Sequence, residues 1–130
     1  MKHSLPIRIY YEDTDFSGVV YHASYLRFLE RGRTELLRDY GVHQAALHSD
    51  EQALAFAVRR MTIDWLKPAK MDDLVTVETR VAELRGASLV LHQSIVLEDR
   101  LLLTAEVLVA LVQGGKPARL TQALREKLAG

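Results

Sequence analysis

The sequence predicts an α+β domain in which one long helix packs against an antiparallel sheet. A stretch of about 18 residues in the first third of the chain carries apolar side chains at helical spacing. Four later stretches read as strands, and the segments between the last three read as tight turns. Because 130 residues can bury one proper core, we expect a single domain that spans residues 1–130.

The long helix is expected to begin near His22 or Ala23 and to end before Gly41, which suits a C-terminal cap. At 1.5 Å per residue its length is roughly 27 Å. Gly32 lies in its middle, where glycine costs about 1 kcal/mol relative to alanine. We therefore expect the helix to pack closely against a sheet or another helix at this point. The apolar stripe consists of Tyr25, Phe28, Leu29, Leu36, Leu37 and Tyr40.

Shorter elements and turns are expected on both sides of this helix. Pro6 marks the edge of an N-terminal strand. Arg85-Gly86 and Glu98-Asp99 read as turns between strands, and Gly114-Gly115 ends the last strand. The expected elements are a strand at 7–11, a short helix at 43–48, strands at 54–66, 73–84, 88–97 and 101–112, and a terminal helix at 117–128.

The 101–112 strand is apolar on both faces. Leu103 and Val107 point to one face, whereas Leu102 and Leu108 point to the other. A strand that is apolar on both faces is covered on both faces. One helix covers only one side of a sheet, so we expect a partner subunit or a further chain to cover part of the other side.

The composition excludes several classes of function. The 17 basic residues balance the 17 acidic residues, so there is no bulk electrostatic reason to bind nucleic acid or an anionic membrane. The chain has no cysteine, which excludes disulfides, thiolate metal sites and cysteine nucleophiles. The first residues lack the apolar core of a signal peptide, and the apolar run at 107–112 is too short to span a bilayer. We expect a cytoplasmic protein.

Familiar metal and hydrolase motifs are absent from the sequence. The five histidines show no HExxH or other ligand spacing, so no metal site is expected. Gly-x-Ser-x-Gly and the glycine-rich phosphate and dinucleotide motifs are also missing. We expect an activity that needs no cofactor.

The most informative segment of the chain places Asp13 and Asp15 in a loop that leads through Ser17-Gly18 into the long helix. An acid near a helix N-terminus is a common reaction site, because free N–H groups and a partial positive charge suit a developing oxyanion. The residues alone leave a second interpretation open. In that interpretation, both aspartates only stabilise the loop and the start of the helix.

The same segment resembles a known family. Tyr11-Glu12-Asp13-Thr14-Asp15 and Gly18-Val19-Val20-Tyr21-His22-Ala23-Ser24-Tyr25 closely resemble the YbgC branch of the 4-hydroxybenzoyl-CoA thioesterase family. The resemblance continues more weakly at 61–63, 85–90 and 105–109 and so covers nearly the whole chain. The family comprises small acyl-CoA thioesterases. The resemblance implies a hotdog fold, in which a curved, five-stranded antiparallel sheet wraps around a long central helix. It also implies hydrolysis of acyl-CoA thioesters to free acid and coenzyme A.

The resemblance also implies roles for individual residues in catalysis. Asp15 matches the catalytic aspartate, which attacks the thioester carbonyl as a nucleophile or activates a water as a general base. The backbone N–H of His22 is implied to stabilise the oxyanion, and its ring is a candidate proton carrier or polar contact. As a lone histidine, His22 also suits a structural role.

Substrate-binding residues are implied in the same way. Gly18, without a Cβ, lets a ligand approach the backbone, and Tyr11 is a candidate substrate contact. Arg85 matches a basic region that holds the coenzyme A phosphates, although a solvated turn arginine is equally compatible with its position. Phe16 stands where many relatives carry a small residue, so it would restrict acyl size if it faces the acyl pocket.

The resemblance implies a homodimer or a dimer of dimers, that is, a homotetramer, with the active site at the dimer interface.

Two other functions stay open. One is a scaffold that binds acyl carrier protein or belongs to the Tol-Pal envelope system, with weak or no catalysis. The other is a hotdog dehydratase, although that class uses a His/Glu pair in a different motif and here Asp15 occupies the key position.

Overall fold

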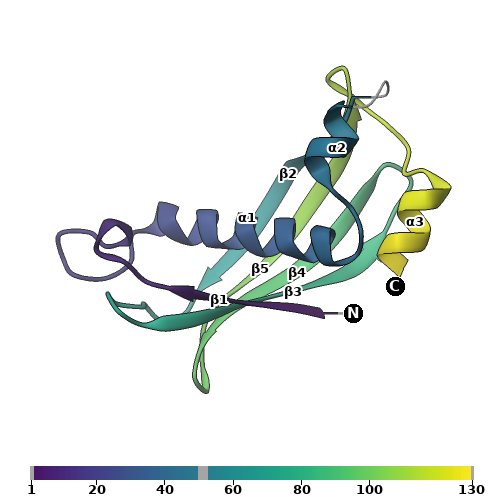
Figure 1. Ribbon diagram of the computed structural model, residues 1–130. Coiled ribbons are helices and arrows are strands. Elements are labelled where there is room, and N and C mark those ends of the chain that lie inside the picture. The colour runs from purple at the N-terminus through teal and green to yellow at the C-terminus, as the bar shows by residue number, and fades with distance from the viewer. Residues whose placement is uncertain (1, 50–52, 130) are drawn as a thin grey trace.

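In the computed structural model, a curled antiparallel sheet wraps around one long helix, α1, which lies along its concave face (Figure 1). The structure describes residues 2–49 and 53–129. The elements are β1 (Lys2–Arg8), the 3-10 helix η1 (Tyr11–Asp13), α1 (His22–Asp39), α2 (Gln44–Ser49), β2 (Leu54–Trp65), β3 (Leu74–Leu84), β4 (Ser88–Leu97), β5 (Arg100–Gln113), β6 (Lys116–Pro117) and α3 (Gln122–Ala129).

The strand order is β1-β3-β4-β5-β2, and the two-residue β6 pairs with β5. All pairs are antiparallel, so β1 and β2 form the two edges of the sheet. The register shifts between Val58 and Arg60, between Val81 and Glu83, and between Ile95 and Val96. Such irregularities bend a strand and increase its twist, which helps the sheet to curl around α1.

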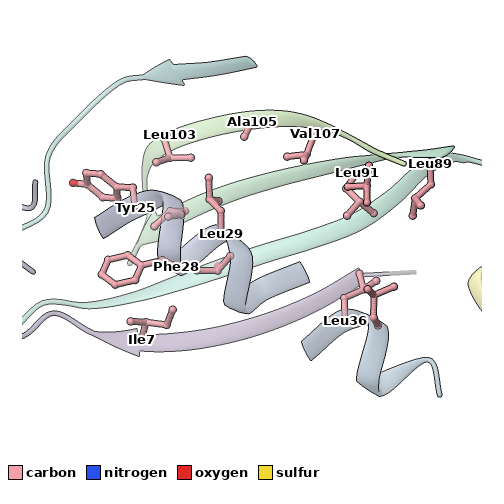
Figure 2. Close-up of a cluster of buried hydrophobic side chains, with 14 of the residues drawn as sticks. Ile7, Tyr25, Phe28, Leu29, Leu36, Leu89, Leu91, Leu103, Ala105 and Val107 are labelled. Carbon is pink, nitrogen blue, oxygen red and sulfur yellow. The ribbon is translucent and has the colours of Figure 1, made fainter. Parts of the chain in front are cut away.

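The core fills the space between α1 and the concave face of the sheet. Figure 2 shows α1 side chains pointing toward side chains of β1, β4 and β5. Phe28, Leu29 and Leu36 of α1 are buried, as the helical spacing predicts. The helix ends as expected at Gly41, whose positive φ of 82° allows the Val42 N–H to bond the Leu37 carbonyl at 2.7 Å.

Gly32 marks the closest approach of α1 to the sheet. A Cβ built on this residue would lie 2.6 Å from Val77 Cγ1 and 2.9 Å from Thr79 Oγ1. The amide of Gln93 lies next to this point and donates to the Leu29 carbonyl and to Thr79 Oγ1, each at 2.9 Å. The close packing expected from the glycine is therefore confirmed, and a buried polar network surrounds it.

The two ends of the chain differ from the sequence prediction. The first strand was predicted at 7–11, but β1 begins at Lys2 and ends at Arg8, because it pairs along its length with β3. Pro6 lies within this strand, which is possible because β1 is an edge strand. Tyr11 lies in η1 instead of a strand.

The terminal helix was predicted at 117–128 and is shorter, because Pro117 belongs to β6. Gly114 and Gly115 both have positive φ and close a two-residue hairpin between β5 and β6. α3 begins only after Thr121, whose hydroxyl accepts the Leu124 N–H at 3.1 Å.

The convex face of the sheet is polar at its centre. Arg80, His92 and Glu106 form a row across β3, β4 and β5. Arg80 Nη2 lies 2.7 Å from His92 Nδ1, and His92 Nε2 lies 3.4 Å from Glu106 Oε2. Two apolar residues of β5 were expected on this face. Leu102 is buried, and its carbonyl accepts the N–H groups of residues 66 and 67. Leu108 is half-buried.

No helix among the described residues is long and apolar enough to cross a membrane.

Candidate active site

The loop between η1 and α1 is a small hairpin that displays Asp15 near its tip. Thr14 bridges Val20, and the Asp15 N–H donates to the Val19 carbonyl at 2.9 Å. The Gly18 N–H donates to the Asp15 carbonyl at 3.0 Å, and Gly18 has a positive φ of 86°, which favours glycine. A Cβ at Gly18 would meet no atom within 4 Å, so a ligand can reach this stretch of backbone.

The carboxylate of Asp15 is exposed and held by Ser17. Its Oδ1 accepts the Ser17 hydroxyl at 2.5 Å and the Ser17 N–H at 2.8 Å. The hydroxyl bond first, and then the N–H bond, hold the pKa of Asp15 below its ordinary value. The group is therefore ionised at neutral pH. Within the described part of the chain, Oδ2 accepts no hydrogen bond, so it is available for a reaction.

His22 is the first residue of α1 and is exposed. Its N–H group has no intrahelical acceptor, as at any helix start, and no other described residue accepts from it. Tyr21, the N-cap residue, provides no side-chain cap, and the first turn of α1 contains no acidic residue. The partial positive charge of the helix end is thus left for a ligand. After the Ser17 bonds, the Val19 backbone and then the nearby His22 side chain also lower the pKa of Asp15, and desolvation opposes them.

The ring of His22 packs against Trp65, the last residue of β2, with ring centroids 5.0 Å apart and an interplanar angle of 80°. Tyr25 contacts the same indole at 5.5 Å, and its hydroxyl accepts the Ala69 N–H at 2.9 Å. Burial raises the pKa of Tyr25. Trp65 was not among the predicted site residues, because only the folded chain brings it beside His22.

The loop is anchored to the segment that joins β2 to β3. The Val20 N–H donates to the Ala69 carbonyl at 2.9 Å, and Val19 bridges Lys70. Ala69 is fully buried. The residues on either side of Asp15 are therefore tied to the body of the protein, whereas its carboxylate faces solvent.

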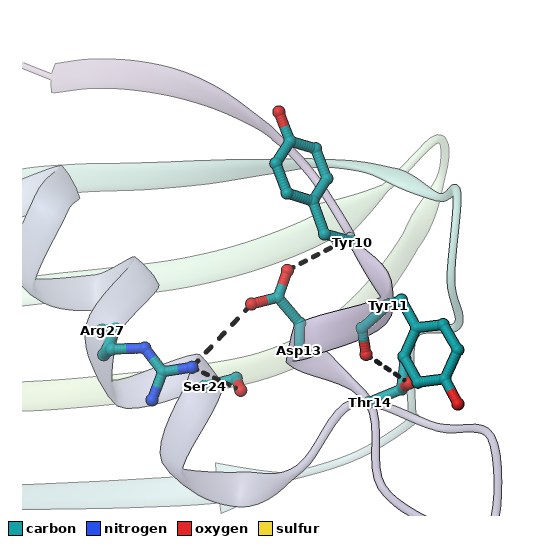
Figure 3. Close-up of polar contacts among 6 residues, drawn as sticks. All are labelled: Tyr10, Tyr11, Asp13, Thr14, Ser24 and Arg27. Atoms are coloured by element: carbon teal, nitrogen blue, oxygen red, sulfur yellow. Dashed lines mark hydrogen bonds and ion pairs between the residues drawn. The ribbon is translucent and has the colours of Figure 1, made fainter.

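Asp13 lies at the base of the loop and is buried, in contrast to Asp15. In Figure 3 its carboxylate points between the backbone of Tyr10 and the side chain of Arg27 on α1. Oδ2 accepts the Tyr10 N–H at 2.8 Å, and Oδ1 lies 3.8 Å from Arg27 Nη2. The same Arg27 nitrogen donates to Ser24 Oγ at 2.9 Å. The two aspartates of the motif thus have different environments.

Two aromatic residues of the loop region are exposed. Tyr11 is 77% exposed in η1, and Phe16 at the loop tip is 109% exposed. In one protomer the Phe16 side chain faces solvent. Its effect on the size of the acyl group stays a prediction.

Arg85 lies at the opposite end of the sheet from Asp15. The 74–84 strand, β3, starts beside the loop region, where the Ile9 N–H bonds the Asp73 carbonyl, and ends at the turn that carries Arg85. At about 3.3 Å per residue, this strand is roughly 35 Å long. One protomer therefore does not bring Arg85 together with Asp15 and His22.

The turn at Arg85 is more basic than the sequence analysis indicated. Arg125 of α3 donates to the Arg85 and Gly86 carbonyls at 2.7 and 3.3 Å. Arg119 lies beside Gly86, with its Nη1 3.4 Å from the position that a Cβ there would take. Glu83 pairs with Arg85 at 3.2 Å, but both side chains are about half exposed, so this ion pair is weak. The three arginines define what we call the basic turn.

The surroundings of Asp15 are open in one protomer. A hollow of about 520 Å³ lies on the convex face and is lined by residues such as Glu78, Arg80 and Glu106. It does not include Asp15 or His22. Among residues 2–49 and 53–129, no three His, Asp or Glu side chains are grouped so that they could hold a metal ion.

Comparison with known proteins identifies the family. The profile of the Thioesterase superfamily matches residues 17–104. Acyl-CoA thioester hydrolase YbgC of Escherichia coli is 51% identical over 108 residues, 82% of this chain and 79% of that protein. Acyl-CoA thioesterase YbgC of Haemophilus influenzae is 50% identical over 113 residues, 87% of this chain and 82% of that protein. The crystal structure of a probable thioesterase from Bartonella henselae has a TM-score of 0.89 and 46% identity, and covers 93% of this chain and 100% of that one.

The curled sheet around α1 and the exposed acid at the helix start define a hotdog-fold thioesterase, and the chain belongs to the thioesterase superfamily. Its relatives at about half identity place it in the YbgC branch. The resemblance and the α+β hotdog fold expected from the sequence are thereby confirmed. The matched segment includes Gly18, His22 and Arg85, whereas Asp15 lies two residues before it.

Proposed function

We propose that this thioesterase hydrolyses acyl-CoA thioesters to free acid and coenzyme A, with Asp15 as nucleophile or general base. Family membership and 50% identity to a YbgC acyl-CoA thioesterase support the reaction. One observation carries the assignment of Asp15. Its ionised carboxylate lies exposed in the loop that leads directly into α1, whose first N–H groups are free.

The arrangement suits attack on a carbonyl carbon. The thioester oxygen would lie at the N-terminus of α1, where the His22 N–H stabilises the negative charge that develops on it. As a general base, Oδ2 of Asp15 would take a proton from the water that attacks the carbonyl carbon, and cleavage of the C–S bond would give the free acid and the thiolate. As a nucleophile, Oδ2 would attack the carbon itself, and cleavage of the C–S bond would leave an anhydride of the acyl group and Asp15, which water then hydrolyses to the free acid and the aspartate. The His22 ring, exposed beside Trp65, is placed to exchange a proton with solvent or with the leaving thiolate.

Substrate contacts near the reacting carbonyl would come from the loop itself. The backbone at Gly18 is open to a ligand, and the Tyr11 side chain in η1 is exposed. We assign Gly18 and Tyr11 to substrate binding on this basis.

The test is thiol release from a panel of acyl-CoA substrates by the wild type and by Asp15→Asn. A thiol-reactive dye gives no protein background, because the chain has no cysteine. We expect activity in the wild type and a loss of about 10²–10⁴-fold or more in the variant. Equal activity in both proteins would show that Asp15 is not the reacting acid, and hydrolysis of no acyl-CoA by the wild type would contradict the activity itself.

We also propose that the working unit is a dimer in which two protomers pair along β2, or a dimer of such dimers. β2 is a 12-residue edge strand without proline, and a long edge strand with free N–H and C=O groups is a template for pairing. Val58 and Trp65 are nearly half exposed on it. A two-fold axis across β2 reverses the strand direction, so the basic turn of one protomer comes to the Asp15 end of the other.

In this dimer the basic turn is where the phosphates of the thiol carrier would bind, with Arg85 as the first candidate. Coenzyme A and acyl carrier protein both present the thiol on a phosphopantetheine arm, so the same acyl group on each carrier should be compared. Acyl carrier protein is thus a second candidate partner.

The cytoplasmic location stays a prediction, which cell fractionation would test.

A further inference from the structure

The carboxylate of Asp13 in η1 is buried and contacts two other parts of the chain. It is 7% exposed, and a buried charge is costly unless it is paired and hydrogen-bonded. Its two oxygens are used separately: Oδ2 accepts the Tyr10 N–H at 2.8 Å, and Oδ1 faces Arg27 Nη2 at 3.8 Å. Figure 3 shows the carboxylate between the chain that follows β1 and the second turn of α1.

The main chain of Asp13 makes two further bonds. Its N–H donates to the Tyr10 carbonyl at 3.0 Å, and its carbonyl accepts the Tyr21 N–H at 2.9 Å. Tyr21 is the N-cap of α1 and directly precedes His22. Asp13 therefore joins Tyr10, which follows β1, the N-cap residue Tyr21 and the side chain of Arg27.

These contacts set the geometry of the reacting groups. The bond from Tyr21 to Asp13, the Thr14–Val20 bridge and the bond from Asp15 to Val19 form consecutive rungs of one short ladder. Asp15 is on one strand of this ladder, and the helix start is at the end of the other. A displacement of Asp13 would therefore move Asp15 relative to the His22 N–H. The anchors at Ala69 and Lys70 hold only the Val19–Val20 side.

We propose that Asp13 is a positioning residue of the hydrolysis: through its hydrogen bonds to Tyr10 and Tyr21 and its ion pair with Arg27, it holds the Asp15 carboxylate in place relative to the N-terminus of α1. This inference rests on the proposed function of Asp15. Asp13 does not touch the substrate. Its replacement affects the alignment of the reacting groups, whereas the basic turn, which is proposed to bind the carrier, lies at the other end of the sheet.

The experiment measures kcat and KM for Asp13→Asn on the best acyl-CoA substrate, with Asp99→Asn as the matched control. Asp99 is exposed in the turn between β4 and β5 and, within the described part of the chain, makes no hydrogen bond or ion pair with the loop. Asparagine keeps the size of the side chain but removes its charge toward Arg27. Since a displacement of about 1 Å can cost about 10²-fold, we expect kcat to fall by about 10–100-fold while KM stays within about threefold. The control is expected to match the wild type.

Rates are expressed per folded molecule, with the folded fraction taken from circular dichroism. A kcat like that of Asp99→Asn, or a loss that disappears after this correction, would overturn the positioning role. If Asp13→Asn does not fold, Arg27→Gln tests the same link from the exposed side, since Arg27 is 52% exposed. Its kcat should fall at unchanged KM relative to Arg31→Gln, a neighbouring exposed arginine on α1, and equal kcat values would overturn the proposal.

Asp15→Asn is measured in parallel, so that a failure of the positioning role of Asp13 can be distinguished from a failure of the proposed role of Asp15. Loss of activity in Asp15→Asn with full activity in Asp13→Asn would leave the proposed function intact and overturn only this inference. Full activity in Asp15→Asn would contradict the assignment of the reacting acid, and the role of Asp13 would be overturned with it.

Discussion

The carboxylate of Asp15 accepts both of its hydrogen bonds from Ser17 through one oxygen, so one side chain closes a turn and remains ionised. The structural interpretation of this aspartate and the catalytic one are therefore compatible. The turn fixes the carboxylate and lowers its pKa, and the second oxygen accepts no hydrogen bond from a described residue.

The low pKa of Asp15 predicts a pH dependence. Because the acid must be ionised to react, the acid limb of kcat/KM lies below the ordinary pKa of an aspartate. Ser17→Ala removes the largest cause of the shift, so the pKa rises and the limb moves to higher pH. Activity at neutral pH should change little, since Asp15 is ionised there in both proteins.

The measurement is the profile of kcat/KM from about pH 3 to about pH 8, limited to the range in which circular dichroism shows folded protein. Ser49→Ala, in α2 and remote from the loop, is the matched control and should keep the wild-type limb. An unchanged limb in Ser17→Ala would mean that a group other than Asp15 sets the acid side of the profile.

The sequence motif predicted the residues of the loop but not the residues that contact them in the folded chain. Asp15, Gly18 and His22 are close in the chain, and the structure places them on one loop and helix start. Trp65 comes from the far end of β2, and its contact with the His22 ring depends on the sheet order. The pairing of Asp13 with Arg27 likewise follows from how η1 meets α1, which no local pattern encodes.

Among the elements, the contact between α1 and the sheet depends on the absence of a side chain at Gly32. Alanine is a better helix former by about 1 kcal/mol, but its Cβ would lie 2.6 Å from Val77 Cγ1, and Val77 is fully buried. Overpacking of a core typically costs about 1–3 kcal/mol. We expect Gly32→Ala to lower the free energy of unfolding by about 1–2 kcal/mol, the helix preference offsetting part of the strain.

Urea unfolding followed by circular dichroism tests this prediction. Arg31→Ala is the control, because Arg31 is exposed on the same helix and its replacement should change the stability by less than about 0.5 kcal/mol. A Gly32→Ala protein at least as stable as the wild type would show that α1 can move away from β3 without cost.

The main elements were predictable because their signals are local and repeated. The helix shows its period over several turns and ends at Gly41, and β4 was predicted with its observed bounds. β1 was predicted to begin at Ile7, because Pro6 suggested the edge of a strand, whereas pairing with β3 sets its observed bounds at Lys2–Arg8. β6 was missed although Gly114-Gly115 is a strong hairpin signal, since only two residues follow in the strand.

For the whole molecule, the arrangement of charged groups argues that one protomer is not a complete site. The Asp15 loop and the basic turn lie at opposite ends of the curled sheet (Figure 1). A single acyl-CoA would have to extend along roughly 35 Å of β3 to reach both groups in one protomer. In a dimer paired through β2, the two groups come from different protomers to the same end, which fits the open surroundings of Asp15.

Mixing two inactive variants tests this arrangement. Asp15→Asn lacks the reacting acid, and Arg85→Ala combined with Arg119→Ala weakens the basic turn, so each homodimer should have low kcat/KM. In a mixed dimer, one site carries both defects and the other carries none. Random exchange of equal amounts makes half of the dimers mixed, so we expect recovery of about a quarter of the wild-type activity at limiting substrate. Exchange is followed with a tag on one variant, and light scattering gives the mass of the assembly. If tagged mixed dimers form and activity stays at the average of the two variants, the acid and the basic turn act within one protomer, and the two-fold arrangement through β2 is wrong.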